Sequence, residues 1–256
     1  MLSISNLKMP KRTCEIQFDA APLASDGNLI ILQHDKHLLG LYDIETFALL
    51  HEIDFLSTDS WNIIDLHWST CLKSFLILTH KYLYTLHDTR IYKTPVTKMN
   101  DDFCSLTSDD DNSKLFLATS RTIQEYSFTA FTLSKQYEIT EFDIYSLRFN
   151  TNTKHFGLTL RSRIDRKWSF QIKDRSMNTL WSVPTSIHHG SCLVSILFSS
   201  NEWLIINHHG DILFHITSDG KIKADVIYGG RMLLNAIEIN KKFLFFRTIG
   251  FLEKYY

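Results

Sequence analysis

Short apolar runs recur along the chain at a regular spacing. Each holds four or five aliphatic or aromatic residues and is followed, after a polar turn, by a second run of strand-like composition. The first runs cover residues 29–32, 75–78, 115–118, 156–160, 203–206 and 243–246, and the second runs cover 39–43, 83–88, 123–127, 168–174, 212–217 and 251–256. Runs this short and this rich in aliphatic and aromatic residues predict β-strands, the first of each pair buried on both faces.

Two further strands accompany each pair. Alternating runs that end in Asn, Asp or Ser turns precede the apolar runs at 64–68, 104–106, 145–149, 194–198 and 235–239, as expected for hairpins. A fourth run closes most repeats, at 48–53, 137–139, 179–183 and 221–227. The second runs end 39 to 47 residues apart. Four strands in about 43 residues is the unit of a β-propeller blade, whose two apolar faces must be covered by neighbours around a ring. A β-sandwich of hairpins, the alternative, would not need six similar units.

We therefore predict an all-β protein, a single β-propeller domain over residues 1–256 with about six four-stranded antiparallel blades. The repeats lie near 14–55, 61–98, 102–139, 143–183, 191–228 and 232–256. The last repeat has only three strands, and residues 1–8, with apolar Leu2 and Ile4, are the candidate for closing it. The alternative is that the chain forms a portion of a seven-bladed ring.

The ends of the predicted third strands resemble those of WD-repeat proteins, which end this strand with Trp-Asp and turn into the fourth strand through a short polar hairpin. The matching positions are Tyr42-Asp43, His87-Asp88 and Lys173-Asp174, whereas Tyr126-Ser127 and Ile216-Thr217 depart further. His209-Gly210-Asp211 is similar to the turn that leads into the third strand. No repeat contains Trp-Asp itself, so the resemblance is to a degenerate WD-repeat-like β-propeller. It implies a rigid scaffold that presents its loops to a protein or peptide.

Charge and cysteine content narrow the function classes. The 27 Lys and Arg residues nearly balance the 28 Asp and Glu residues, which argues against a general nucleic-acid binder or a polybasic membrane binder. No apolar stretch is long enough to span a membrane, no signal-peptide core is present and no N-x-S/T sequon occurs, so we expect an intracellular, cytoplasmic protein. The four cysteines are too scattered for a disulfide scaffold or a zinc site and are expected to be buried small apolar residues.

Two sets of loops are expected to share one rim of the ring. The loops between second and third strands are mostly basic, with Lys36, Lys81, Arg121, Arg161, Arg163, Arg166, Lys167 and Arg247. The connections between blades are mostly acidic, so the rim as a whole carries mixed charge, which is typical of a protein-contact surface. One basic loop, residues 161–167, is longer than its counterparts and is the first candidate for partner binding.

Paired histidines mark the same rim of the fifth repeat. His188 and His189 begin the loop into this repeat, and His208 and His209 lie between its second and third strands, with Asp211 nearby. Such a set is acceptable for zinc or copper. Paired histidines in polar loops are, however, more often exposed hairpin residues, so no metal or other cofactor is predicted.

No nucleotide-binding loop, catalytic-serine motif or zinc-protease motif occurs, and no pair of carboxylates stands out. The sequence therefore predicts a non-catalytic scaffold, not an enzyme, that mediates protein–protein interaction as part of a multi-subunit complex. The candidate partner-binding residues are Arg161, Arg163, Arg166, Lys167, His188, His189, His208 and His209. The alternative is a propeller hydrolase or metalloenzyme with its site at the central channel.

Overall fold

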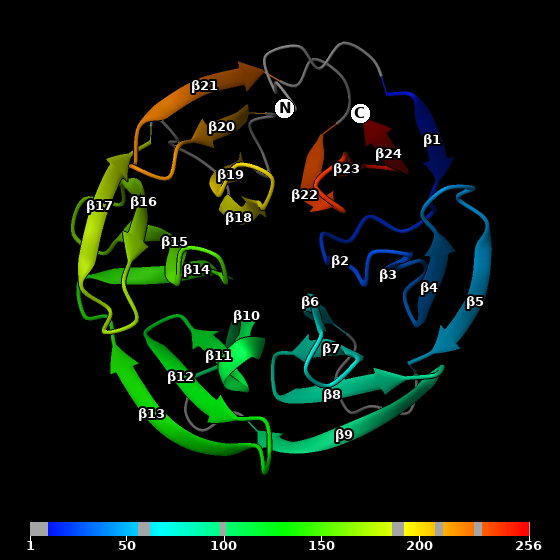
Figure 1. Ribbon diagram of the computed structural model, residues 1–256, viewed down its shortest axis with the longest axis horizontal. Helices are drawn as coiled ribbons and strands as arrows, with labels where there is room; N and C mark the ends of the chain where they lie inside the picture. Colours follow the sequence, from blue (N-terminus) through cyan, green and yellow to red (C-terminus); the bar gives the residue numbers. More distant parts are fainter. Residues whose placement is uncertain are drawn as a thin grey trace.

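The computed structural model describes residues 10–55, 62–97, 101–185, 192–207, 212–227 and 232–255. In these residues the chain forms 24 strands and one short 3-10 helix, η2 (Asp110–Asn112). The strands make six four-stranded antiparallel sheets arranged in a ring around a central axis (Figure 1). The predicted all-β propeller of six blades is confirmed.

Each blade runs from an inner strand beside the axis to an outer strand at the rim (Figure 1). Blade 1 contains β2 (Leu23–Ser25), β3 (Leu29–Gln33), β4 (Leu38–Asp43) and β5 (Leu49–Asp54), and blade 2 contains β6 (Ile63–Ser69), β7 (Ser74–Thr79), β8 (Tyr82–His87) and β9 (Arg90–Thr97). Blade 3 contains β10 (Phe103–Asp109), β11 (Lys114–Thr119), β12 (Thr122–Ser127) and β13 (Thr132–Glu138), and blade 4 contains β14 (Phe142–Asn150), β15 (His155–Ser162), β16 (Trp168–Lys173) and β17 (Thr179–Pro184). Blade 5 contains β18 (Cys192–Leu197), β19 (Glu202–Asn207), β20 (Ile212–Ile216) and β21 (Ile222–Ile227), and blade 6 contains β22 (Leu233–Ile239), β23 (Phe243–Thr248), β24 (Phe251–Tyr255) and β1 (Arg12–Glu15).

The amino-terminal strand β1 closes the ring. It pairs antiparallel with β24, with Arg12 opposite Lys254 and Glu15 opposite Phe251. The sequence placed this closing strand in residues 1–8, which lie outside the described residues; the strand in the structure is instead Arg12–Glu15, and blade 1 begins at Leu23 rather than at residue 14. An outer strand needs few apolar residues because one of its edges and much of its surface face solvent, so the polar sequence of β1 gave no strand signal.

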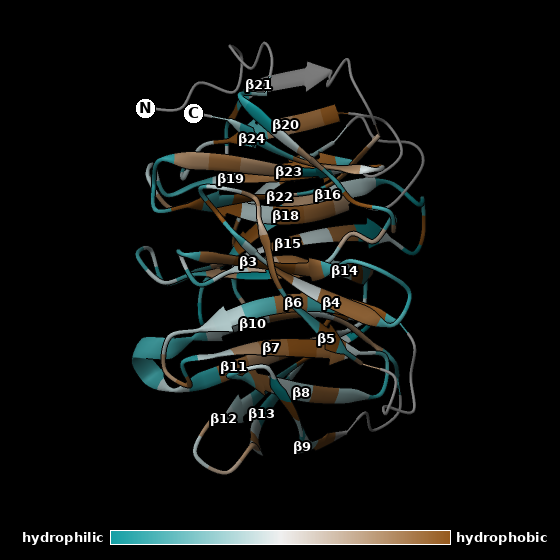
Figure 2. Ribbon diagram, turned by 90° about the vertical axis from the view of Figure 1, so that its right-hand side faces the viewer, coloured by the Kyte–Doolittle hydropathy of each residue, from teal (hydrophilic) through white to brown (hydrophobic). Residues whose placement is uncertain are grey.

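The core consists of apolar side chains packed between neighbouring blades. Between blades 3 and 4, the Phe116 ring centroid lies 5.9 Å from that of Phe149 and 4.8 Å from that of Phe156. Between blades 4 and 5, Trp203 is buried so close to Gly157 that a Cβ there would lie 2.5 Å from the indole ring. Neighbouring blades therefore cover each other's apolar faces at these positions, as predicted for a ring of blades, and Figure 2 shows the hydrophobic strands stacked between polar turns.

The ring has two faces with different connections. The hairpin face carries the turns that join first to second strands and third to fourth strands of a blade. The connector face carries the turns that join second to third strands and the connections from one blade to the next. The loop of residues 161–167 joins β15 to β16 and therefore lies on the connector face. Among the described residues, no helix has the length and apolar character needed to cross a membrane.

Candidate functional site

A cavity of about 350 Å³ lies at the hairpin-face end of the central channel. It is lined by the last residues of the inner strands and by the turns that follow them, from every blade. Apolar side chains such as Trp68, Phe149 and Ile237 share the wall with polar ones such as His67, Arg148 and Glu238. The channel is therefore a mixed surface whose chemistry depends on how its ionisable groups are bonded.

The central ion pair joins Arg148 of blade 4 to Asp65 of blade 2. The two guanidinium nitrogens of Arg148 lie 2.7 and 2.8 Å from the two carboxylate oxygens of Asp65, a bidentate arrangement. The side chains are only 15% and 7% exposed. The same carboxylate accepts hydrogen bonds from Ser105 Oγ at 2.9 Å and from the Leu106 amide at 3.0 Å, both in blade 3. One cluster thus ties three consecutive blades together.

Burial, together with the nearby Arg148 guanidinium, lowers the pKa of His67 to about 4. Its imidazole is therefore neutral at pH 7, with Nε2 at 2.8 Å from Ser108 Oγ of the next blade. Asp110 accepts hydrogen bonds from Ser69 Oγ at 2.8 Å and from the amide and hydroxyl of Thr70 at 2.7 and 2.8 Å. Burial opposes the ionisation of Asp110, but these bonds outweigh it and hold the pKa of Asp110 below its usual value.

The other carboxylates of the cavity also bond to protein groups. Glu238 accepts hydrogen bonds from the amide of Ser199 at 2.8 Å and from its hydroxyl. Asp111 pairs with Lys154 at 2.5 Å. Each of these contacts joins one blade to the next. Across the described ranges, no group of three or more His, Cys, Asp or Glu side chains is arranged to hold a metal ion.

On the connector face, the structure brings together the four basic candidates of residues 161–167. Arg163 anchors this loop: its Nε donates to Asp143 at 2.8 Å, and its two other nitrogens donate to the carbonyls of Thr140 and Phe142 at 3.0 and 3.1 Å. These acceptors all belong to β14 or the connection before it. Arg163 therefore braces the loop against the preceding connection rather than pointing freely into solvent.

The remaining cations of the loop are more accessible. Arg161 Nε donates to the Arg166 carbonyl at 3.2 Å, which tightens the loop. Arg166 and Lys167 lie 3.7 and 3.4 Å from carboxylates, yet their side chains are 62% and 80% exposed. Between them and Arg163, Ile164 is 91% exposed. Sequence reasoning missed Ile164, although a single aliphatic residue inside a basic loop was a visible signal.

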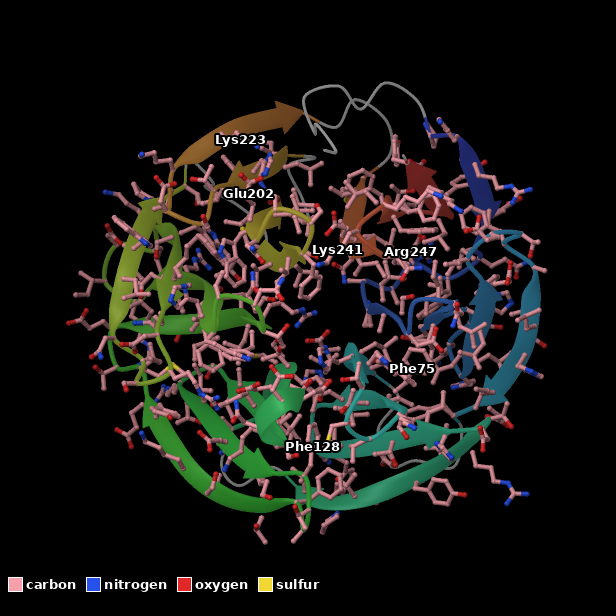
Figure 3. All side chains as sticks on the ribbon, in the orientation of Figure 1. Phe75, Phe128, Glu202, Lys223, Lys241 and Arg247 are labelled. Carbon is pink, nitrogen blue, oxygen red and sulfur yellow. The ribbon has the colours of Figure 1, made fainter. Side chains whose placement is uncertain are left out.

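The other predicted residues divide into two groups. His188, His189, His208 and His209 lie outside the described residues. Arg247, counted in the basic rim, is fully buried in β23 and donates to the carbonyls of Thr248 and Phe251 at 3.0 Å and to that of Phe18 (Figure 3). Burial lowers its pKa to about 10. Arg247 fastens the segment between β1 and β2 to blade 6 and does not belong to the rim.

The fold places this protein among the six-bladed β-propellers. No family model and no curated protein matches the sequence. Solved structures that this chain resembles include the β-propeller domain of Swd1 (Cps50) from Myceliophteria thermophila, at 11% identity and a TM-score of 0.65 over 96% of this chain and 98% of that one. They also include a chain of the mitotic checkpoint complex, at 8% identity and 0.69 over 96% and 90%, and the Kuenenia stuttgartiensis hydrazine synthase, at 9% and 0.70 over 91% and 82%. At these identities the likeness shows the fold alone.

Proposed function

We propose that this protein is a non-catalytic, WD-repeat-like scaffold that binds a protein partner through the loop of residues 161–167. The observation that carries the proposal is the 91% exposure of Ile164 on a loop that Arg163 braces through three hydrogen bonds. A loop that is ordered before binding loses less conformational entropy in the complex. An exposed aliphatic side chain held in this way is suited to fill a partner's pocket and form the centre of a contact.

The charges of the loop indicate the partner's chemistry. Residues 161–167 carry four cations and one carboxylate, Asp165. The exposed ends of Arg166 and Lys167, which follow Ile164 in the same loop, can pair with carboxylates of a partner. The expected partner surface is therefore an apolar pocket bordered by Asp or Glu side chains.

The channel supports a structural role rather than catalysis in this proposal. Its carboxylates Asp65, Asp110, Asp111 and Glu238 all accept hydrogen bonds or ion pairs that join neighbouring blades. The mitotic checkpoint complex and hydrazine synthase structures illustrate that this architecture occurs both in a multi-protein complex and in an enzyme. The free state of all four cysteines supports an intracellular site of action.

Quantitative affinity capture of the tagged protein from its own cells tests the proposal. Ile164→Asp and the double variant R166E/K167E should each deplete the same set of captured proteins at least fivefold. The matched control is K81E/R121E, which reverses two exposed charges in the corresponding loops of blades 2 and 3. Circular dichroism of each purified variant verifies that the fold is retained. Equal capture by wild type and both loop variants would overturn the assignment of residues 161–167.

A further inference from the structure

Three turns between third and fourth strands, on the hairpin face, share an apolar residue that packs against the core. In blades 1, 3 and 4, a residue near the end of this turn has a positive φ and an apolar side chain: Phe47 (58°), Phe131 (50°) and Met177 (66°). Each side chain packs into the apolar cluster between its own blade and the preceding one. Phe47, for example, lies 5.8 Å from the Phe245 ring of blade 6. We call these three residues the plugs.

Blade 2 has no plug. Its turn from β8 to β9 consists of Asp88 and Thr89 alone, with φ of 49° and 76°. A turn of two residues with both φ positive is the tight hairpin type, which matches the twist of the strands. Such a turn is too short to place a side chain over the apolar cluster. The Asp88 side chain is 89% exposed. The corresponding turns in blades 1, 3 and 4 have four or five residues, enough to bring a side chain back over the cluster.

A cleft of about 490 Å³ lies between blades 1 and 2 beside this short turn. Five of its lining residues are apolar, Leu29, Leu41, Trp68, Phe75 and Leu86, and the other six are polar or charged, Asp26, His51, Lys73, His87, Asp88 and Thr89. Trp68 also lines the central cavity, so the cleft and the cavity meet at this side chain. Phe75, labelled in Figure 3 between β4 and the strands of blade 2, marks the position of the cleft. The volume is in the range of sites that bury a ligand group.

The same boundary lacks a contact that the other boundaries have. At the five other boundaries, hydrogen bonds join the first hairpin of one blade to that of the next: Thr70–Asp110, Lys154–Asp111, Asn152–Asn201, Ser199–Glu238 and Asn240–Gly27. Between the turns at residues 25–29 and 69–74, all of which the structure describes, no hydrogen bond or ion pair is formed. Blades 1 and 2 are therefore less tightly joined on the hairpin face.

We propose that this cleft binds a segment of a partner protein that inserts one large apolar side chain, Phe or Met, between blades 1 and 2. The chain itself indicates which side chain fits, because Phe47, Phe131 and Met177 fill the equivalent place at three other boundaries. The two carboxylates that line the cleft already have partners: Asp26 accepts from the amides of Asn28 and Leu29 at 2.7 Å, and Asp88 lies 3.3 Å from His87 Nε2. Lys73 also lines the cleft and is exposed, with no ion pair among the described residues. A carboxylate next to the inserted side chain would pair with Lys73. The cleft lies on the face opposite residues 161–167, so this inference is independent of the proposed function.

The test uses a phage-displayed random peptide library selected against the intact protein. Selected peptides should share a Phe or Met next to Asp or Glu, and their affinity is measured by fluorescence polarisation. The first variant replaces Asp88 and Thr89 with the five residues 44–48 of blade 1, which supplies a plug from within. The second variant, Lys73→Glu, leaves the turn unchanged and serves if the graft fails to fold. Lys241→Glu is the matched control, because Lys241 is exposed, has a φ of 54° against 49° for Lys73 and occupies the corresponding turn of blade 6.

The graft should abolish peptide binding, and Lys73→Glu should weaken it about tenfold, a loss typical of one charge-assisted contact. Lys241→Glu and R166E/K167E should leave the affinity unchanged. Peptides without an apolar anchor, or full affinity in both the graft and Lys73→Glu, would overturn the proposal. So would concentration-dependent dimerisation that the graft removes, since the occupant would then be a second copy of this chain. Peptide binding lost in R166E/K167E alone would place the site on the connector face and equally refute the cleft.

Discussion

Replacement of Arg148 by methionine tests how much the channel ion pair stabilises the ring. Methionine keeps the apolar stem of the side chain and removes the charge. The change leaves the Asp65 carboxylate buried, with donors remaining at Ser105 Oγ (2.9 Å) and at the amides of Leu106 (3.0 Å) and Leu66 (2.9 Å). Removing one partner of a buried ion pair typically costs about 3–5 kcal/mol of folding free energy. Because three donors still solvate the carboxylate, we expect a loss of about 3 kcal/mol.

The opposite single change and the double change complete a cycle. Asp65→Asn keeps the shape of the side chain but leaves the Arg148 charge without a carboxylate, facing the carbonyls of Leu106 and Leu147 at 3.0 and 2.9 Å and Ser105 Oγ at 3.1 Å. We expect it to cost about 2–3 kcal/mol as well. In D65N/R148M no charge is left buried and unpaired, so its cost should be smaller than the sum of the single costs by about 2 kcal/mol.

Equilibrium urea unfolding at pH 7, followed by far-UV circular dichroism, measures these differences. Lys154→Met is the control, because its ion pair with Asp111 also joins neighbouring blades but is 43% and 68% exposed. An exposed pair of this kind contributes about 0–1 kcal/mol. If R148M costs no more than Lys154→Met, or if the two single changes add without coupling, the reasoning that one buried cluster holds blades 2, 3 and 4 together is refuted.

Three further changes probe other contacts. The pKa of His67 is about 4 in the folded state and about 6.5 in the unfolded state, so between these two pH values mainly the unfolded state binds the proton. As the pH falls through this interval, the wild type should therefore lose roughly 3 kcal/mol of unfolding free energy that His67→Gln does not lose. Urea midpoints measured at each pH check this difference. Lys254→Met should cost about 1–3 kcal/mol in urea unfolding, because the fully buried ammonium donates to the Ile44 carbonyl at 3.0 Å and so fastens the closing blade to blade 1; no loss would contradict that role. Phe47→Ala should cost about 3–5 kcal/mol in urea unfolding, since it empties a plug that is 8% exposed, whereas Leu133→Ala at a 41% exposed site should cost much less.

The architecture was largely predictable because burial between blades imposes the same strand pattern on every repeat. The apolar run at 75–78, for example, became β7 (Ser74–Thr79), which is buried throughout. The closing strand was not predictable from that pattern, because Arg12–Glu15 is mostly exposed and needs no apolar alternation. Cys71 shows the same limit: it was expected to be buried, yet it lies exposed in the turn after β6.

The resemblance to WD repeats also had mixed value for the turns. Asp43 accepts hydrogen bonds from the amides of Glu45 and Thr46, at 3.0 and 2.7 Å, and so shapes the turn that carries the plug Phe47. Asp174 does the same in blade 4, where its side chain accepts from the amide of Ser176 at 2.8 Å. Asp88, which was also a matching position in the sequence, lies within a two-residue turn and shapes no such loop. Similar dipeptides thus precede turns of different length.

The candidate binding residues were harder to predict because charge counting does not show which charges are already paired. Arg163 and Arg247 looked like equivalent members of a basic rim. In the structure the first braces a loop and the second is fully buried between the chain's amino-terminal segment and blade 6. What sets Ile164 apart is its exposure, which depends on tertiary contacts of its neighbours rather than on its own residue type.

The turn between the third and fourth strands of a blade can differ in length without disturbing the ring, and its length determines where a partner can enter. The strands must keep their apolar faces because neighbouring blades bury them on both sides. The turn from third to fourth strand adds to that core its plug and, in blades 1 and 3, one more apolar side chain, Ile44 or Phe128. Shortening the turn removes these side chains without breaking the ladder of β8 and β9. Beneath it, Phe75 and Leu86 stay buried, at only 4% and 3% exposed, while Trp68 at the edge of the cleft is partly exposed. A boundary altered in this way stays folded and gains an opening for an apolar side chain from outside, which a ring with six identical turns would not offer.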